Sequence, residues 1–232
     1  MACKSIFHAG LVLVLIQLIS CSGKPANLGR SKWITLFDGK SLAGWHSYLK
    51  SEASPKWKVE DHCIVLTEKG AGDLLTDKEY EDFELELEWK ISEGGNSGII
   101  YHVHEAPEFK TADVTGLEMQ VLDNERHPNA KQGADRRAGS LFDLYAPSDS
   151  LACRPAGQWN KARIVVKQRK AEHYLNNRKI VEYALDGPEW DRRISDSKFK
   201  NWTSLGKFPR GHLALQDHGD RVWYRRIRIR EL

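Results

Sequence analysis

The strongest constraint on the fold is the segment FELELEW at Phe83–Trp89, where apolar and acidic residues alternate without interruption. A period of two puts the apolar side chains on one face of a β-strand and Glu84, Glu86 and Glu88 on the other. A strand of this kind has one buried face and one face in water. The segment therefore predicts an amphipathic strand within a packed sheet.

Short runs of similar character recur along the chain, separated by turn residues. The further predicted strands are Trp33–Phe37, Trp57–Leu66, Ile99–His104, Leu117–Leu122, Ala162–Val166, His173–Leu175, Lys179–Tyr183, Leu213–Gln216 and Val222–Ile229. Asn176 and Asn177 predict a tight hairpin turn, because asparagine tolerates the left-handed conformation that such turns require. No stretch shows sustained helical spacing, and we expect Gly187–Arg210 to be a long surface excursion with one short helical turn. About ten strands without alternating helices predict an all-β fold of two packed antiparallel sheets.

The N-terminus has the pattern of a targeting signal. Lys4 precedes the apolar run Leu11–Ile19, which is too short to span a bilayer, and Ser20 stands before Cys21. The tetrad LISC resembles the bacterial lipoprotein cleavage box, in which the cysteine becomes the lipidated first residue; an ordinary signal peptide is the alternative. We expect a signal peptide at 1–20, a tether at 21–31 and one domain at 32–232. The protein would then be exported to the cell envelope and held at the membrane only by its lipid.

The charge balance argues against a nucleic-acid partner. The formal net charge is +3, so the many basic residues are matched by acids. The arginines of Val222–Ile229 have the spacing of a solvated sheet face rather than of a basic binding patch. Cys63 and Cys153 could form a disulfide in an exported protein, or remain as two buried thiols.

Aromatic residues are numerous, with eight tryptophans and seven tyrosines, and together with planar polar side chains they suit carbohydrate recognition. The tryptophans in strand registers are expected in the core: Trp33, Trp57 and Trp89. Those in loops are candidates for the rim of a binding site: Trp159, Trp190 and Trp202. The glutamates of FELELEW lack the Glu-x-Asp-x-x-Glu spacing of a retaining β-glucanase, so a standard two-carboxylate glycosidase is disfavoured.

The run Gln216–Asp220, QDHGD, is more polar than a strand connection requires. Histidine ordinarily titrates near neutrality, so His218 is a candidate acid or base, with a loop-capping role as the alternative. On the strand Leu117–Leu122, Glu118 and Gln120 share the face opposite Met119 and Val121, which is either a binding surface or a solvated face. His102 and His104 could hold a divalent cation together with Glu118; no cofactor is certain.

Seven stretches in order give the chain a family resemblance. They are WITLFDGKSLAGW, GNSGIIYHV, LEMQVLDN, AGSLFDLYAP, PAGQWNKARIVVK, EHYLNNRKIVEY and HLALQDHGDRVWYRRIRIREL. On these motifs the chain resembles the 3-keto-disaccharide hydrolase family, whose fold is a concanavalin A-like jelly-roll β-sandwich. The resemblance implies cleavage of glycosides oxidised at C3: a base removes the acidified C2 hydrogen, the C1 substituent leaves, and water adds.

Strand register and loop composition then suggest roles for individual residues. The proton-transfer group would be His218, Glu118 and Asp143, with Arg163 or a bound cation at the enolate oxygen. The residues expected to hold sugar hydroxyls are Gln120, Asp123, Tyr145, Gln216 and Asp217. For Asp143 and Arg163, a structural ion pair is the alternative. A non-catalytic glycan-binding module on the same fold is the competing function, and a structural envelope protein that binds no sugar is a third.

Overall fold

The computed structural model describes Met1, residues 31–149 and residues 151–232. The predicted lipidation site at Cys21 and, apart from Met1, the predicted signal peptide lie outside the described residues. Ser31–Leu232 forms one compact unit. In this part of the chain, no helix is both long and apolar enough to cross a membrane.

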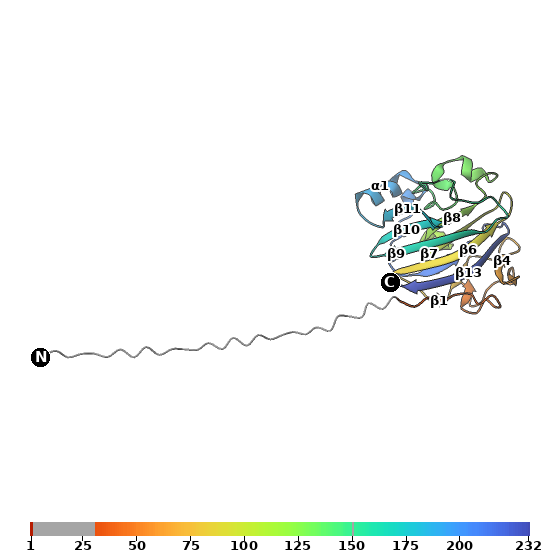
Figure 1. Cartoon of the computed structure of the whole chain (residues 1–232), viewed down its shortest axis with the longest axis horizontal. Helices are drawn as coiled ribbons and strands as arrows, with labels where there is room; N and C mark the ends of the chain where they lie inside the picture. Colours follow the sequence, from red (N-terminus) through yellow and green to blue (C-terminus); the bar gives the residue numbers. More distant parts are fainter. Residues whose placement is uncertain (2–30, 150) are drawn as a thin grey trace. The chain divides into compact units, whose positions relative to one another are not determined.

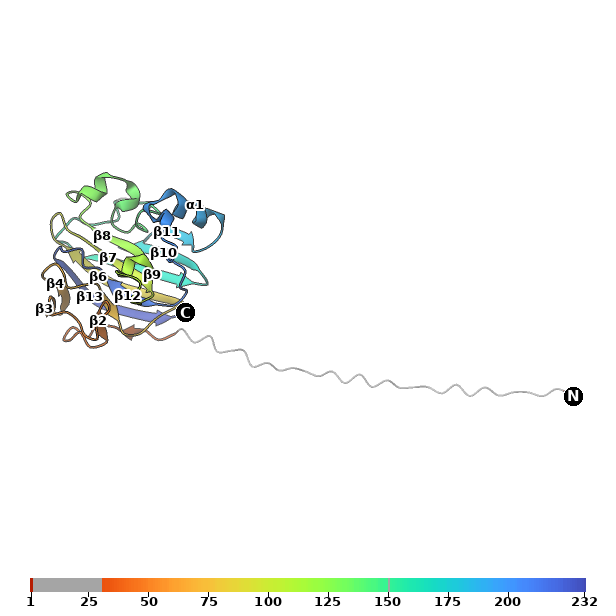
Figure 2. The ribbon, with the colours of Figure 1, turned by 180° about the vertical axis from the view of Figure 1, so that it is seen from behind.

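The domain consists of two antiparallel sheets, which confirms the predicted fold class. Sheet A has the order β11-β10-β9-β6-β13-β4-β3, and β1 also pairs with β13. Its strands are β1 (Ile34–Thr35), β3 (Trp57–Glu60), β4 (Cys63–Leu66), β6 (Phe83–Ile91), β9 (Asn160–Lys167), β10 (Lys170–Leu175), β11 (Arg178–Ala184) and β13 (Val222–Glu231). Figures 1 and 2 view the domain from opposite sides and show the two layers.

Sheet B has the order β2-β5-β12-β7-β8. Its strands are β2 (Trp45–Ser47), β5 (Leu74–Thr76), β7 (Asn96–Val103), β8 (Leu117–Leu122) and β12 (His212–Leu215). The sequence pattern did not predict β2 and β5, because strands of three residues are too short to display a period. The predicted hairpin at Asn176 and Asn177 is confirmed, with φ angles of 49° and 68°.

The core lies between the sheets. The apolar side of FELELEW supplies Phe83, Leu85 and Trp89, which pack in one cluster with Met119 and other residues of sheet B. Full burial of such side chains contributes about 1.5–3 kcal/mol each to folding, and it selects the register that hides them. Trp57 and Trp89 are buried as predicted. Trp33 is not: it lies partly exposed beneath the Arg228 guanidinium, 4.4 Å from its ring.

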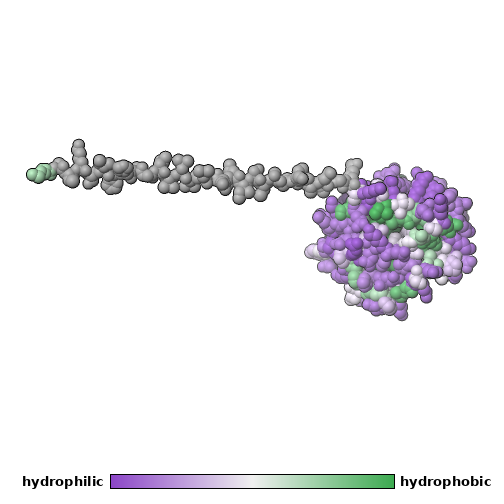
Figure 3. Space-filling model, turned by 90° about the horizontal axis from the view of Figure 1, so that it is seen from below, coloured by the Kyte–Doolittle hydropathy of each residue, from purple (hydrophilic) through white to green (hydrophobic). Residues whose placement is uncertain are grey.

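Arginine–glutamate pairs cover the outer face of sheet A. Strand pairing sets Arg225, Arg228 and Arg230 opposite Glu88, Glu86 and Glu84, and each of the three pairs forms an ion pair. A bulge at Arg226, with a φ of 53°, shifts the register so that Tyr224 and Ile229 both point inward. The prediction of a solvated face is confirmed. Figure 3 shows one side of the domain, where hydrophilic residues predominate around scattered apolar patches.

Short helices lie in three of the connections between strands. They are η1 (Ala112–Val114), η2 (Pro128–Lys131), η3 (Ala134–Arg136), α1 (Pro188–Asp196) and η4 (Lys198–Asn201). The excursion after β11 is therefore more helical than expected, since Pro188 starts a nine-residue helix held by Glu189–Arg192 and Glu189–Arg193 pairs. Figure 1 shows α1 and the green helical turns between β8 and β9 on the same side of the domain. Trp190 is buried against Tyr183, so the prediction that it forms a binding-site rim is wrong.

Candidate functional site

Glu118 lies on the outer face of sheet B. Strand pairing aligns it with Ile100, while Gln120 is opposite Gly98. Because Gly98 has no side chain, the Glu118 carboxyl leans along the strand over it; a Cβ at residue 98 would lie 2.4 Å from Glu118 Oε1. With the Gln120 side-chain amide in the orientation that gives both its ends suitable partners, its nitrogen donates to Glu118 Oε1 and to the Ser97 carbonyl, at 2.9 Å each. The predicted shared face of Glu118 and Gln120 is present, and their contact orients the carboxyl group.

The surroundings of Glu118 disfavour its charged form. Burial raises the pKa of Glu118 from 4.5 to about 8, and the nearby carboxylates of Asp113 and Asp73 add to this, while the Lys198 ammonium opposes it. The group lies at a narrow pocket lined mainly by apolar side chains, among them Phe142 and Leu205. Near neutral pH it is thus a carboxylic acid. A carboxylic acid can donate a hydrogen bond or a proton, which a carboxylate cannot.

Asp73 is a second buried carboxyl on this side of sheet B. Burial raises its pKa to about 6, against the opposing effect of hydrogen bonds from the backbone of Asp217 and Ala112. Those N–H groups lie 2.9 Å and 3.3 Å from its oxygens, so Asp73 joins the loop after β12 to η1. Sequence reasoning missed Asp73, because one acid before a three-residue strand carries no local signal.

In the polar run after β12, the Asp217 side chain is hydrogen-bonded to the backbone, whereas the Gln216 side-chain oxygen has no partner among the described residues. Asp217 Oδ2 accepts from the N–H groups of Ala71 and Gly72, at 2.6 Å and 3.0 Å, which fixes the loop. Gln216 donates its backbone N–H to Gly98 O and so lies across Gly98 from Gln120. The side-chain Oε1 of Gln216 is buried and has no hydrogen-bond partner among the described residues. Buried polar atoms are ordinarily paired, so this oxygen is available to a ligand donor or to water.

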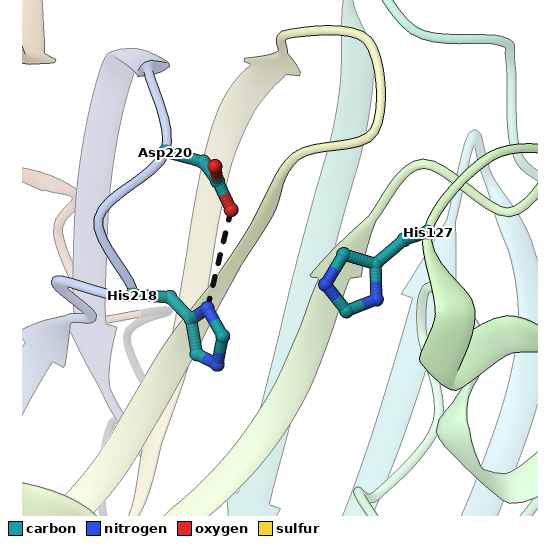
Figure 4. Close-up of side chains that lie close together, drawn as sticks. All are labelled: His127, His218 and Asp220. Atoms are coloured by element: carbon teal, nitrogen blue, oxygen red, sulfur yellow. Dashed lines mark ion pairs between the residues drawn. The ribbon is translucent and has the colours of Figure 1, made fainter.

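His218 meets two residues at the end of sheet B. Its Nδ1 lies 3.9 Å from Asp220 Oδ2, and its ring centroid lies 6.1 Å from that of His127. Asp220 Oδ2 also accepts from the backbone N–H of Asn96, at 3.0 Å, which holds the carboxylate in place. Figure 4 shows His127 on the loop before η2, facing His218 and Asp220 on the loop after β12. Within the described ranges, these three are the one set of three or more His, Cys, Asp or Glu side chains whose ligand atoms converge, all within 4.8 Å.

Three other predicted site residues have structural partners. Asp143 pairs with Arg136 at 2.5 Å and accepts from the backbone N–H of Lys198 at 2.8 Å. Asp123 accepts from Gly94 N and Glu125 N, which closes two turns. Tyr145 stacks on Tyr183, with ring centroids 5.2 Å apart, beneath the Arg193 guanidinium. Asp143 therefore matches its ion-pair alternative, and the contacts of Asp123 and Tyr145 are structural ones.

Arg163 does not join the predicted site. It belongs to β9 of sheet A, where its guanidinium pairs with Glu84 at 3.0 Å and stacks on Tyr174 at 3.6 Å. Strand alternation puts it on the outer face, because its neighbours Ala162 and Ile164 are buried. The sandwich core separates it from the outer face of sheet B. The expectation that it contacts the same ligand as Glu118 is corrected.

The structure also gives no support to the cation set of His102, His104 and Glu118. His102 has a φ of 56°, and its Nε2 lies 2.8 Å from the Glu81 carbonyl. His104 stacks on Phe208, with ring centroids 4.0 Å apart. The bulge at His102 breaks the alternation on which the expectation rested. Cys63 and Cys153 are likewise unpaired thiols among the described residues.

A larger hollow, of about 390 Å³, lies on the outer face of sheet A beside the Arg226 bulge. Its charged side chains already pair with one another, since Lys161 and Arg228 contact Glu86 and Arg226 contacts Glu88. Although burial opposes it, hydrogen bonds from Arg228 and Lys161 lower the pKa of Glu86, so this carboxyl is charged near neutral pH. The raised pKa of Glu118 and the converging side chains around His218 therefore favour this part of sheet B as the candidate site.

Comparisons with known proteins identify the family of the chain. Residues 32–230 match the family described as the 3-keto-alpha-glucoside-1,2-lyase-like domain. A Bacteroides thetaiotaomicron protein named 3-keto-disaccharide hydrolase is 38% identical over 228 residues, which cover 86% of this chain and 78% of that protein. A Parabacteroides distasonis crystal structure, described as a candidate glycosyl hydrolase, has 30% identity and a TM-score of 0.80, with 86% of this chain and 94% of that one covered. A second structure from that organism, with a similar description, has 25% identity, a TM-score of 0.68 and coverage of 87% and 100%.

Proposed function

Because the chain belongs to the 3-keto-alpha-glucoside-1,2-lyase-like family, we propose that it cleaves the glycosidic bond of 3-keto-glycosides by elimination and hydration. The name of the Bacteroides thetaiotaomicron relative supports an oxidised disaccharide or related glycoside as substrate. The single observation that carries the proposal is the Glu118 carboxyl held beside Gln120 on the outer face of sheet B, where burial raises its pKa to about 8. In this proposal Glu118 is the acid and His218 is the base, so the reaction does not need a widely spaced pair of carboxylates.

In the elimination, His218 takes the proton from C2 of the sugar, and the electron pair forms the enolate of the C3 ketone. The enolate then re-forms the C3 carbonyl, a double bond forms between C1 and C2, and the bond from C1 to the leaving oxygen breaks. Glu118 donates its proton to that oxygen. His218 ends protonated and Glu118 ends as a carboxylate, so protons balance.

The hydration step reverses these roles. The Glu118 carboxylate takes a proton from water, the resulting hydroxide adds to C1, and His218 returns its proton to C2. Both residues recover their starting forms, and the products are the free 3-keto sugar and the released alcohol. Gln120 and the unpartnered oxygen of Gln216 are suited to hold sugar hydroxyls beside Gly98.

Asp220 supports the assignment of His218 as the base. Its carboxylate lies 3.9 Å from Nδ1 of His218, beyond hydrogen-bond distance, and its negative charge favours the proton on Nδ1, which leaves the lone pair of Nε2 for the substrate. The Asn96 N–H in turn holds the carboxylate in this position.

The direct test incubates the protein with a 3-keto-glucoside and with its unoxidised parent, and measures release of the alcohol. We expect release from the keto form alone, and loss of it in His218→Ala. Release from neither compound, or equal release from both, would contradict the proposal. Binding of the keto form without cleavage would favour the glycan-binding alternative.

A further inference from the structure

With Arg163 on the other sheet, the proposed reaction needs another group to stabilise the enolate oxygen. From the geometry around His218 we propose that His127 is a catalytic residue, whose neutral imidazole donates an Nε2–H hydrogen bond to the C3 oxygen of the substrate. This inference rests on the proposed function and adds the enolate-stabilising residue.

The hydrogen bonding of His127 determines which of its nitrogens carries the proton. His127 is the residue before η2, and its Nδ1 accepts from the backbone N–H of Asn129 at 3.1 Å. A nitrogen that accepts cannot carry a proton, so the neutral ring has its proton on Nε2. The imidazolium form would need a second proton on Nδ1, in direct conflict with the Asn129 N–H. The hydrogen bond from Asn129 therefore favours a neutral His127 ring with its proton on Nε2.

The environment of the ring acts in the same direction. Burial lowers the pKa of His127, and the facing His218 lowers it further, while Asp220 and Asp123 oppose the shift. A neutral imidazole donates a hydrogen bond without giving up its proton, which is the requirement for stabilising an enolate repeatedly.

The spacing of the two histidines fits proton abstraction next to a carbonyl. In Figure 4, Nε2 of His127 faces the loop that carries His218 and Asp220. The converging atoms of the three side chains lie within 4.8 Å of one another. C2 and the C3 oxygen of a 3-keto sugar are separated by one carbonyl carbon, so a base and a donor at this spacing can reach both. During the step, the C2–H bond breaks towards His218, the electron pair moves to the C3 oxygen, and the His127 N–H bond stays intact.

His127, His218 and Asp220 could also be the ligands of a metal ion. The hydrogen bond from the Asn129 N–H to His127 Nδ1 distinguishes a metal ligand from a hydrogen-bond donor. A cation at His127 Nε2 would have to replace the proton that the Nδ1 contact keeps there. Metal-bound histidines ordinarily donate from their other ring nitrogen, whereas Nδ1 of His127 accepts. The local bonding therefore favours a donor over a ligand.

The first test uses ¹⁵N-histidine-labelled protein and needs no substrate. Long-range ¹H–¹⁵N spectra should assign His127 to the Nε2–H tautomer at neutral pH, and added Zn²⁺ should leave its ring signals unchanged. An Nδ1–H tautomer, a protonated ring at neutral pH, or saturable Zn²⁺ shifts at His127 would overturn the inference. Asn129→Pro, which lacks the capping N–H, should populate both tautomers.

The second test separates this role from the proposed function as a whole. In D₂O, the wild type should exchange the C2 hydrogen of a 3-keto-glucoside and cleave it. His127→Leu should lower both rates on the order of 10²–10³-fold with little change in KM, as expected for loss of one oxyanion donor, and His127→Gln should recover part of this. An inactive wild type would overturn the proposed function together with this role. An active wild type with an equally active and stable His127→Leu variant would overturn the role of His127 alone.

Discussion

The Glu118 carboxyl occupies the space that a side chain at Gly98 would take, with 2.4 Å between Oε1 and a Cβ built at residue 98. The two residues lie on neighbouring strands, offset by two residues, and the missing side chain lets the carboxyl reach towards Gln120. The acid is thus positioned by a glycine that makes no hydrogen bond to it.

Gly98→Ala should displace the Glu118 side chain from Cγ outward and leave the strand pairing intact, because the three atoms closest to the added Cβ all belong to that side chain. We expect a fall in kcat/KM of tenfold or more, about 1.4 kcal/mol in transition-state stabilisation, and a melting temperature within a few degrees of the wild type. Steady-state kinetics and thermal unfolding provide the measurements. Full activity in a folded Gly98→Ala protein would show that the position of Glu118 over residue 98 is unimportant.

Glu118 should make stability depend on pH. Its folded pKa of about 8 is above its ordinary value of 4.5, so between these values the folded state keeps a proton that the unfolded state has lost. Stability therefore falls as pH rises through this window, by roughly 2 kcal/mol between about pH 6 and pH 8. Glu118→Gln should remove this part of the slope. Urea unfolding of both proteins at several pH values would measure it, and parallel slopes would contradict the raised pKa.

The activity of the wild type should also decline above about pH 8, where Glu118 loses the proton that it is proposed to give to the leaving oxygen. Glu118→Gln should be slower by roughly 10²–10⁴-fold on substrates with a poor leaving group, because the amide cannot transfer a proton. Substrates with an acidic leaving group should be much less affected. A uniform loss across leaving groups would assign Glu118 to binding instead of proton transfer.

Asp217 should matter for folding more than for affinity. Asp217→Ala leaves the N–H groups of Ala71 and Gly72 without their acceptor, at an expected cost of about 1–3 kcal/mol. Asp217→Asn keeps one side-chain oxygen and is the matched control, with a smaller loss. Chemical denaturation gives the stability, and KM for a 3-keto-glucoside should change little in either folded variant. A large KM effect without destabilisation would restore the predicted sugar contact.

Arg163→Ala provides a test of the corrected assignment. Its ion pair with Glu84 and its contact with Tyr174 are partly exposed, so we expect at most about 1 kcal/mol of destabilisation. Activity should remain within twofold of the wild type, whereas Gln216→Ala should raise KM. A tenfold loss of activity in Arg163→Ala would return this residue to the reaction.

Export as a lipoprotein remains a prediction from residues 18–21. Metabolic labelling with palmitate in a bacterial host should mark the wild type and not Cys21→Ser. The wild type should fractionate with membranes, and the variant should be found in the soluble fraction. Label in both proteins, or in neither, would contradict lipidation at Cys21.

The sequence by itself determined the fold class, most of the strands and the family. Alternation in FELELEW and LEMQVL specifies which side chains face the core. One face of each strand packs on the core and the other faces away from it, and a one-residue slip in register would exchange the two faces. The same alternation predicted that Glu118 and Gln120 share a face, and that the arginines of β13 lie outside the core.

Only the tertiary structure decided which polar residues meet. Arg163 and Glu118 both follow strand alternation, yet their strands belong to different sheets, so the core separates them. Asp73, His127 and His218 are far apart in the chain and reach sheet B through loops whose paths depend on long-range hydrogen bonds such as Asp73 to Asp217. The raised pKa of Glu118 has the same origin, because burial among Phe142, Leu205 and two further acids is a property of the assembled sandwich. Local periodicity encodes the direction of a side chain, whereas its partners and its proton affinity depend on what the fold brings around it.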